Sequence, residues 1–241
     1  MIHKTFVALL ATLLLSSILL AQPEPPKSEE YIVYKDSKVH DIKTDLEKPV
    51  RVDYIAPGET TTVNLMPGGG IWRQFETYQE CTVNISGGFC VNFYSYDNST
   101  INISGGTLHN YSSFKDNTIV KISEGELEGS THIDDKAKAT ITGGRFESLI
   151  VSDKAQATVS GGRYKYICAA GKSEIKIIGT DFTIDGVPTK DTKILHEKKY
   201  EDYNVEDRRL TCILPNKDKL NINVRVLDTA VIILETAKTD K

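Results

Sequence analysis

A short motif that ends in glycine recurs through the middle of the chain at an almost constant interval, and no other feature of the sequence limits the fold as strongly. Each copy has a branched apolar residue at its centre. The copies span residues 84–88, 102–106, 121–125, 140–144, 158–162 and 176–180. The steps between their central residues are 18, 19, 19, 18 and 18, and residues 64–69 form a degenerate copy in front. A fixed period of this length indicates stacked repeats, none of which buries its apolar face alone.

Apolar and polar residues alternate around the motif. Val83 and Ile85 alternate with Asn84 and Ser86, and a period of two predicts a β-strand with one buried face. The central residues are expected to stack as an interior ladder of Ile85, Ile103, Ile122, Ile141, Val159 and Ile177. A second apolar position follows the motif at Cys90, Leu108, Leu127, Phe146, Tyr164 and Phe182. A third follows three residues later at Phe93, Tyr111, Leu149 and Ile167.

Each repeat also contains a second turn signal. It consists of Asp97, Asp116, Asp135, Asp153 and Gly171, each followed by Asn or Lys. Asp and Asn close turns by bonding their own backbone and tolerate left-handed dihedral angles. Two fixed corners per repeat predict an all-β fold, a single-stranded parallel β-solenoid of about six to seven coils of 18–19 residues with N- and C-terminal β caps. A β-sandwich would need hairpin turns and more variable strand spacing.

The flanks divide the chain into further segments. Residues 1–21 predict a signal peptide, because His3 and Lys4 precede an apolar run that ends at Ala21. An uncleaved membrane anchor is the alternative, but the run is shorter than the roughly 20 residues of a span. We expect a linker over 22–30, an N-terminal cap over 31–62, the solenoid over 63–188 and a C-terminal β cap over 189–241. The mature protein is expected to be secreted or at the cell surface, with no membrane span.

The Ser-Gly-Gly coils, together with the ending at 179–188 and 210–234, resemble the parallel β-helix repeat proteins that many bacteria secrete. The resemblance covers roughly residues 63–235 and implies the architecture. It does not choose between functions, because such folds serve lyases, hydrolases, adhesins and surface proteins alike.

Charge and composition exclude several classes of function. The net charge is −4 and both signs are mixed along the chain, so the basic footprint of a nucleic-acid-binding protein is absent. The four cysteines allow three disulfide connectivities and contain no C-x-x-C zinc pattern. The five histidines share no coil position, and neither a metal site nor a cofactor is expected. The row of corner aspartates has the ligand type of a calcium site, but turn formation is the favoured interpretation.

One outward row of polar residues is the candidate ligand-binding site. It consists of Asn84, Ser86, Asn102, Ser104, Thr140 and Thr158. Amide and hydroxyl groups on a flat sheet suit a polysaccharide or another cell-surface component, although a solvated sheet face would have the same pattern. Exposed aromatic residues also bind sugars, and the candidates are Trp72, Tyr94, Tyr96, Tyr111 and Phe114, some of which must belong to the core.

A strip of acids and bases follows the glycine corner at Glu126, Glu128, Arg145, Glu147, Arg163 and Lys165. Cross-strand ion pairing explains it, and acid–base catalysis is the alternative. Catalytic β-helices carry long loops around a cleft, whereas these coils vary by one residue only. The sequence therefore favours a non-catalytic secreted binding or structural protein over a β-helix carbohydrate-active enzyme, a polysaccharide lyase or glycoside hydrolase.

Overall fold

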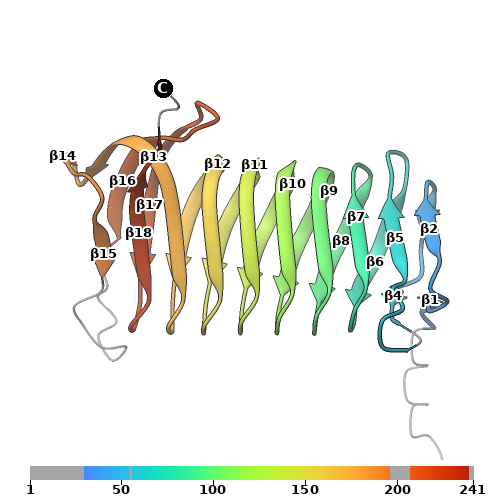
Figure 1. Cartoon of the computed structure of the whole chain (residues 1–241). Coiled ribbons are helices and arrows are strands. Elements are labelled where there is room, and N and C mark those ends of the chain that lie inside the picture. Colours follow the sequence, from blue (N-terminus) through green and yellow to red (C-terminus); the bar gives the residue numbers. More distant parts are fainter. Residues whose placement is uncertain (1–29, 55, 196–206, 239–241) are drawn as a thin grey trace, which may run out of the picture. The chain divides into compact units, whose positions relative to one another are not determined.

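The computed structural model describes residues 30–54, 56–195 and 207–238. The chain divides into residues 1–30 and residues 31–241, and the second unit is an all-β solenoid of about eight parallel turns, each about 19 residues long. Its strands stack side by side along the axis (Figure 1). The predicted signal peptide and almost all of the predicted linker lie outside the described residues.

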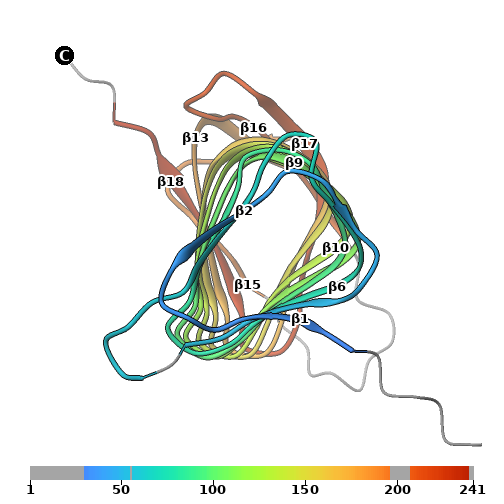
Figure 2. The same cartoon turned by 90° about the vertical axis from the view of Figure 1, so that its right-hand side faces the viewer.

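Each complete turn has three sides, as β10 (Ile119–Ile133) illustrates. Its pairing with the preceding turn shifts register at Glu124, and its pairing with the following turn shifts register between Leu127 and Ser130. These shifts separate a first side before the glycine corner, a second side directly after it, and a third side that ends at the aspartate corner. Successive turns superpose when viewed along the axis (Figure 2), so that equivalent residues form straight rows.

The central turns are the most regular. β9 (Thr100–Phe114), β10, β11 (Lys138–Val151) and β12 (Gln156–Ala169) each follow all three sides. In the two preceding turns the strand is interrupted at the glycine corner, which gives β5 (Thr62–Leu65), β6 (Gly70–Thr77), β7 (Thr82–Ile85) and β8 (Phe89–Ser95). All of these neighbours pair in parallel, as Ile122 does with Ile103 and Ile141.

Parallel stacking begins earlier than the glycine motif indicates. β1 (Ile32–Tyr34), β2 (Val39–Ile42), β3 (Asp45–Leu46) and β4 (Val50–Val52) are short strands. β1 pairs in parallel with β4, and β2 pairs in parallel with β5. Residues 31–62, which the sequence predicts as a cap, thus contribute a further turn without a glycine pair, and the solenoid has about eight turns rather than six to seven.

The C-terminal residues close the stack with mixed pairing. β13 (Glu174–Ile184) follows the first side and then leaves the coil, pairing antiparallel with β14 (Val187–Pro188) and β16 (Arg208–Ile213). β16 forms an antiparallel hairpin with β17 (Lys219–Val226). β17 then lies parallel to the third side of β12, and β18 (Val231–Thr236) lies parallel to β13. A last strand, β15 (Lys193–Leu195), runs antiparallel to β18.

The interior agrees with the predicted ladder. All six central residues of the motif are buried, and so are all six residues of the second apolar position. The third position is wrong for Tyr111, because the register shifts after Cys90 and pairs Tyr111 with Asn92 instead of Phe93. Tyr111 consequently points outward, whereas Phe114, a candidate exposed aromatic residue, is fully buried.

The glycine corner of β11 is too tight for a side chain at Gly143. A Cβ atom on Gly143 would lie 1.9 Å from the carbonyl oxygen of Ser123 in the preceding turn, and Gly144 has a φ of +93°. Non-glycine residues are disfavoured in that region. The two glycines together therefore allow one turn to lie directly on the next.

Candidate functional site

The six predicted ligand-binding residues lie on the outer face of the first side in two adjacent rows, with Asn84, Asn102, Thr140 and Thr158 in one and Ser86 and Ser104 in the other. Asn84 pairs with Asn102, and Thr140 pairs with Thr158. Lys121 lies between the two pairs in register. None of the six is buried, so the expected outward orientation is present.

The asparagines of this row bond to one another. The Nδ2 atom of Asn102 donates to Oδ1 of Asn84 at 2.9 Å, and Asn84 donates in the same way to Asn64 at 2.9 Å. Asn64 in turn donates to the Asp41 carboxylate at 2.8 Å. The amides thus form a ladder that ties four turns together, and part of their hydrogen-bonding capacity is used inside the protein.

The hydroxyl groups beside the glycine corner are also engaged. Ser86 donates to the carbonyl oxygen of Leu65 and Ser104 to that of Ile85, both at 3.5 Å. The same long contact recurs at Ser123, Thr142 and Ser160. The polar first side therefore has a structural role in joining successive turns.

The strip of acids and bases lies on the second side, and its members form exposed ion pairs. Arg145 lies 3.7 Å from Glu126, and Lys165 pairs with Glu147. Glu128 bonds His109 at 2.7 Å. A shallow hollow of about 240 Å³ lies among Glu126, Leu127, Glu128, Arg145 and Glu147. Ion pairing between side chains of neighbouring strands accounts for the arrangement.

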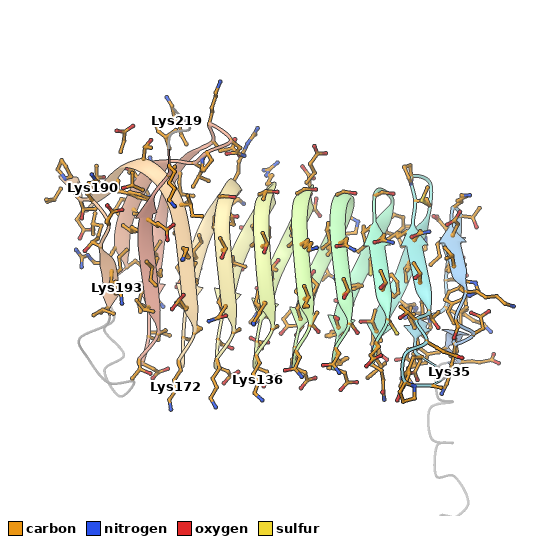
Figure 3. The ribbon with its side chains drawn as sticks, viewed as in Figure 1. Lys35, Lys136, Lys172, Lys190, Lys193 and Lys219 are labelled. Atoms are coloured by element: carbon orange, nitrogen blue, oxygen red, sulfur yellow. The ribbon has the colours of Figure 1, made fainter. Side chains whose placement is uncertain are left out.

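The corner aspartates adopt the left-handed backbone conformation of their turns. Asp97, Asp116, Asp135 and Asp153 all have φ between 55° and 58°, which is the left-handed region expected of these turns. Lys136 and Lys172 extend outward along the same edge (Figure 3). Within the described residues, no group of three or more His, Cys, Asp or Glu side chains is arranged to hold a metal ion.

A cluster that the sequence analysis did not identify lies on the outer face of the third side. Its centre is Glu76, a carboxylate with only 6% exposure. Arg51 donates from Nη2 to Glu76 Oε2 at 2.9 Å, and the Tyr31 and Tyr78 hydroxyls each donate to the carboxylate at 3.1 Å. Gln74 also donates to Glu76 and to the Tyr31 hydroxyl. Every charge in the cluster is paired, as the burial of a carboxylate requires.

Aromatic rings extend this cluster along the solenoid. The Arg51 guanidinium lies over the rings of Tyr31 and Tyr78, 4.4 and 5.2 Å from their centroids. Tyr78 stacks on Tyr96 with centroids 5.0 Å apart. The Tyr111 ring lies between those of Tyr94 and His132, with centroid separations of 5.7 and 4.9 Å. We call this surface, made by Tyr31, Arg51, Gln74, Glu76, Tyr78, Tyr94, Tyr96, Tyr111 and His132, the tyrosine face.

Burial shifts the pKa of four groups of the tyrosine face, Tyr78, Tyr94, Tyr96 and His132, toward their neutral forms. Burial, and secondarily the negative charge of Glu76, raises the pKa of Tyr78 to about 12. Burial also raises the pKa of Tyr94 and Tyr96, and it lowers the pKa of His132. At neutral pH the surface therefore presents phenol hydroxyls and a neutral imidazole beside the Arg51–Glu76 ion pair.

These residues meet because their strands pair in register, although the spacing between them along the sequence is unequal. Arg51, Glu76 and Tyr94 occupy the same position in three successive turns. The glycine motif does not reveal this row, because the turns that carry it differ in length. A recognisable signal was the density of tyrosine in residues 78–111.

Trp72 provides a separate exposed aromatic group on the second side. Its side chain is 53% exposed, its Nε1 donates to the Asp45 carboxylate at 3.2 Å, and the Phe89 ring lies edge-on at 4.7 Å. It belongs to the same N-terminal turns as the tyrosine face.

Comparison of the chain with protein-family models, with curated proteins and with solved structures found no match. Among the described residues there is no helix of the length and apolarity that crossing a membrane requires. The chemistry of the surfaces themselves is therefore the basis for assigning a function.

Proposed function

We propose that this chain is a secreted or cell-surface, non-catalytic β-solenoid that binds polysaccharide through the tyrosine face. The observation that carries the proposal is the Glu76 carboxylate, which holds Arg51 and two tyrosines in place in a partly exposed aromatic surface. Aromatic edges and phenol hydroxyls offer both apolar contact and hydrogen bonds, the combination that suits a sugar ring.

Preorganisation supports this assignment over a purely structural role for the face. Tyrosine gives a large amphipathic contact with few rotatable bonds, and the stacking of Tyr78 on Tyr96 restricts both rings before any ligand arrives. Binding then costs little additional side-chain entropy. On the polar first side, Asn84, Asn102 and Ser104 already bond to neighbouring turns.

The proposal is tested by measuring affinity for a panel of neutral and acidic polysaccharides on an array and then by affinity electrophoresis. Replacement of Tyr96 or Tyr111 by alanine is expected to weaken the best ligand about tenfold, as the loss of a central aromatic contact does. Thr140→Ala with Thr158→Ala is the matched control on the first side. Loss of binding in that control, with the tyrosine variants unchanged, would transfer the site to the polar row.

Export from the cell is the second part of the proposal. It rests on the charged, apolar and cleavage-site order of residues 1–21, and on the resemblance of the coils to secreted bacterial β-helix proteins. Mass spectrometry of the exported protein is expected to find an N-terminus near Gln22. A mature protein that retains Met1 would contradict it.

An enzymatic function is the alternative, favoured by the acids and bases around the hollow on the second side. Incubation with pectin, alginate, hyaluronan and xylan, with and without calcium, tests it. Release of unsaturated or reducing ends that Glu147→Gln abolishes would replace the non-catalytic proposal with this one.

A further inference from the structure

A shallow groove of about 730 Å³ runs over the glycine corners of three successive turns. Its floor is glycine backbone, and its charged lining comes from Glu124, Glu126, Arg145, Arg163 and Asp218. The first four lie on the coils themselves. Asp218 instead comes from the turn between β16 and β17, at the C-terminal end of the stack (Figure 1).

Asp218 occupies the groove as a built-in carboxylate. Its Oδ2 accepts a hydrogen bond from the backbone N–H of Gly162 at 3.1 Å, and its Oδ1 lies 4.0 Å from Nε of Arg163. Asn216 donates to the same carboxylate at 2.6 Å and lies against Gly161. The protein thus already shows a carboxylate seated on one glycine corner beside an arginine.

The preceding turn repeats the glycine and the arginine, and its arginine lies near Glu126 of the neighbouring coil instead of near Asp218. Arg145 is the register partner of Arg163, and Gly144 has a φ of +93°, close to the +101° of Gly162. Two arginines directly opposite each other on adjacent strands repel. Arg163 is 79% exposed and lies 4.0 Å from Asp218, and Arg145 is 65% exposed and lies 3.7 Å from Glu126, so neither guanidinium is at hydrogen-bond distance from its carboxylate.

We infer that Gly144 and Arg145 form a second binding site, separate from the tyrosine face, for the carboxylate of an acidic sugar residue. The guanidinium supplies a charge-assisted hydrogen bond to the carboxylate, which is stronger than a neutral one. The carboxylate takes the position relative to Gly144 and Arg145 that Asp218 takes relative to Gly162 and Arg163.

The other groups in the groove favour a uronic acid over an acidic peptide. Glu124, Glu126 and the Ser123 and Thr142 side chains line the same groove, and they suit the hydroxyl groups that accompany each carboxylate in an acidic sugar. Addition of a peptide strand needs an open sheet edge, whereas these corners lie between paired turns. The choice of a sugar rests on the proposed function; the carboxylate site itself does not.

The test is calorimetric titration of the whole protein with an oligosaccharide of uronic acid residues and with its methyl ester. Esterification removes the charge and is expected to weaken binding about tenfold or more, as the loss of a charged hydrogen bond does. Arg145→Gln is expected to produce the same loss and to abolish the difference between acid and ester. Lys165→Gln, which removes a positive charge from the second side without lining the groove, is expected to leave both affinities unchanged.

Asp218→Asn gives an independent readout, because it removes the charge of the carboxylate that already lies at Gly162 and Arg163. The variant is expected to bind the acidic oligosaccharide several-fold more tightly, since Gly162 and Arg163 become available next to the first site. Equal binding of acid and ester, or an unchanged affinity in Arg145→Gln, would overturn the carboxylate site. Tighter binding of an acidic peptide of equal charge would overturn the assignment of its occupant. The Tyr96→Ala measurement on neutral polysaccharide is independent of these outcomes, so the two surfaces can fail separately.

Discussion

The carboxylate of Asp116 accepts a hydrogen bond from the backbone N–H of Asp97, its equivalent one turn earlier, with 3.1 Å between Oδ2 and N. The relationship recurs along the aspartate corner, from Gln79 to Asp97 and from Gly171 to Asp228. The backbone of Asn117 also donates to the Asp97 carbonyl at 2.8 Å. The corners of Asp97 and Asp116 are therefore joined by both main chain and side chain.

Removal of the Asp116 side chain tests this role. Asp116→Ala loses the side-chain hydrogen bond and places alanine at a φ of 55°, where a residue without a local hydrogen bond is strained by about 1–2 kcal/mol. We expect the free energy of unfolding in urea to fall by about 2 kcal/mol. Asp116→Gly is expected to recover the backbone part of that loss, and Lys136→Ala, an exposed corner residue, to have little effect. Equal stability of all three variants would show that the corner carboxylate is dispensable.

The interior ladder provides a second prediction. Ile122 is 1% exposed and lies between Ile103 and Ile141. Ile122→Ala is expected to lower the free energy of unfolding by about 2–5 kcal/mol through the cavity it leaves, and Ile122→Asp by more, because it buries an unpaired charge. Thr100→Asp, on the outer face of the neighbouring turn, is the control for the added charge. Similar melting temperatures for Thr100→Asp and Ile122→Asp would mean that the strand faces the other way.

The architecture could be predicted because the motif that reveals the period is also the motif that makes the corner. Glycine at positions such as Gly143 is imposed by the carbonyl of the turn below, so the constraint repeats with the coil. Residues 31–62 and 189–241 were predicted as caps and not as coils for the same reason, because neither segment contains a glycine pair. Asp228 turns its corner with a φ of 57°, but no glycine motif follows it, and β2 belongs to a turn with no glycine pair.

The tyrosine face could not be derived from the period. Arg51 and Glu76 are 25 residues apart, well outside the 18–19-residue step, because the intervening corner is longer. Tyr111 was assigned to the wrong face by a single extra residue in its turn, and a one-residue slip reverses the facing of a side chain. The polar row of the first side was found by alternation alone, yet alternation does not reveal that Asn84 and Asn102 bond each other.

Alkaline titration tests the environment of the tyrosine face. Burial raises the pKa of Tyr78 to about 12, against 10 for an exposed tyrosine. The folded protein then holds a proton that the unfolded chain releases, so the resulting stabilisation is complete below pH 10 and is lost as the pH rises through about 12. We expect absorbance of ionised tyrosine to appear in two phases, with unfolding accompanying the second. A single phase near pH 10 in the folded protein would contradict the burial of these hydroxyls.

The Glu76→Gln variant separates the causes of that shift. Glu76 contributes less than burial to the raised pKa of Tyr78, so the pKa is expected to fall in the variant but to remain above 10. The variant also leaves Arg51 without its partner, and the free energy of unfolding is expected to fall by about 2 kcal/mol, less than for a fully buried pair because Arg51 is partly exposed. An unchanged titration would mean that Glu76 does not contact the tyrosine hydroxyls in solution.

The four cysteines give the last prediction, which concerns the redox state of the folded protein. All four are free and buried. Burial raises the pKa of Cys81 and of Cys212 to about 12 and also raises that of Cys90 and Cys168. Since the thiolate is the reactive form, we expect no rapid reaction with a thiol reagent at pH 8 in the native state. Four thiols per chain are expected to react once the protein is denatured. Fewer than four in denatured, unreduced protein would show that the solenoid contains a disulfide, and rapid reaction of the native protein would show that a cysteine is more exposed than the packed coils allow.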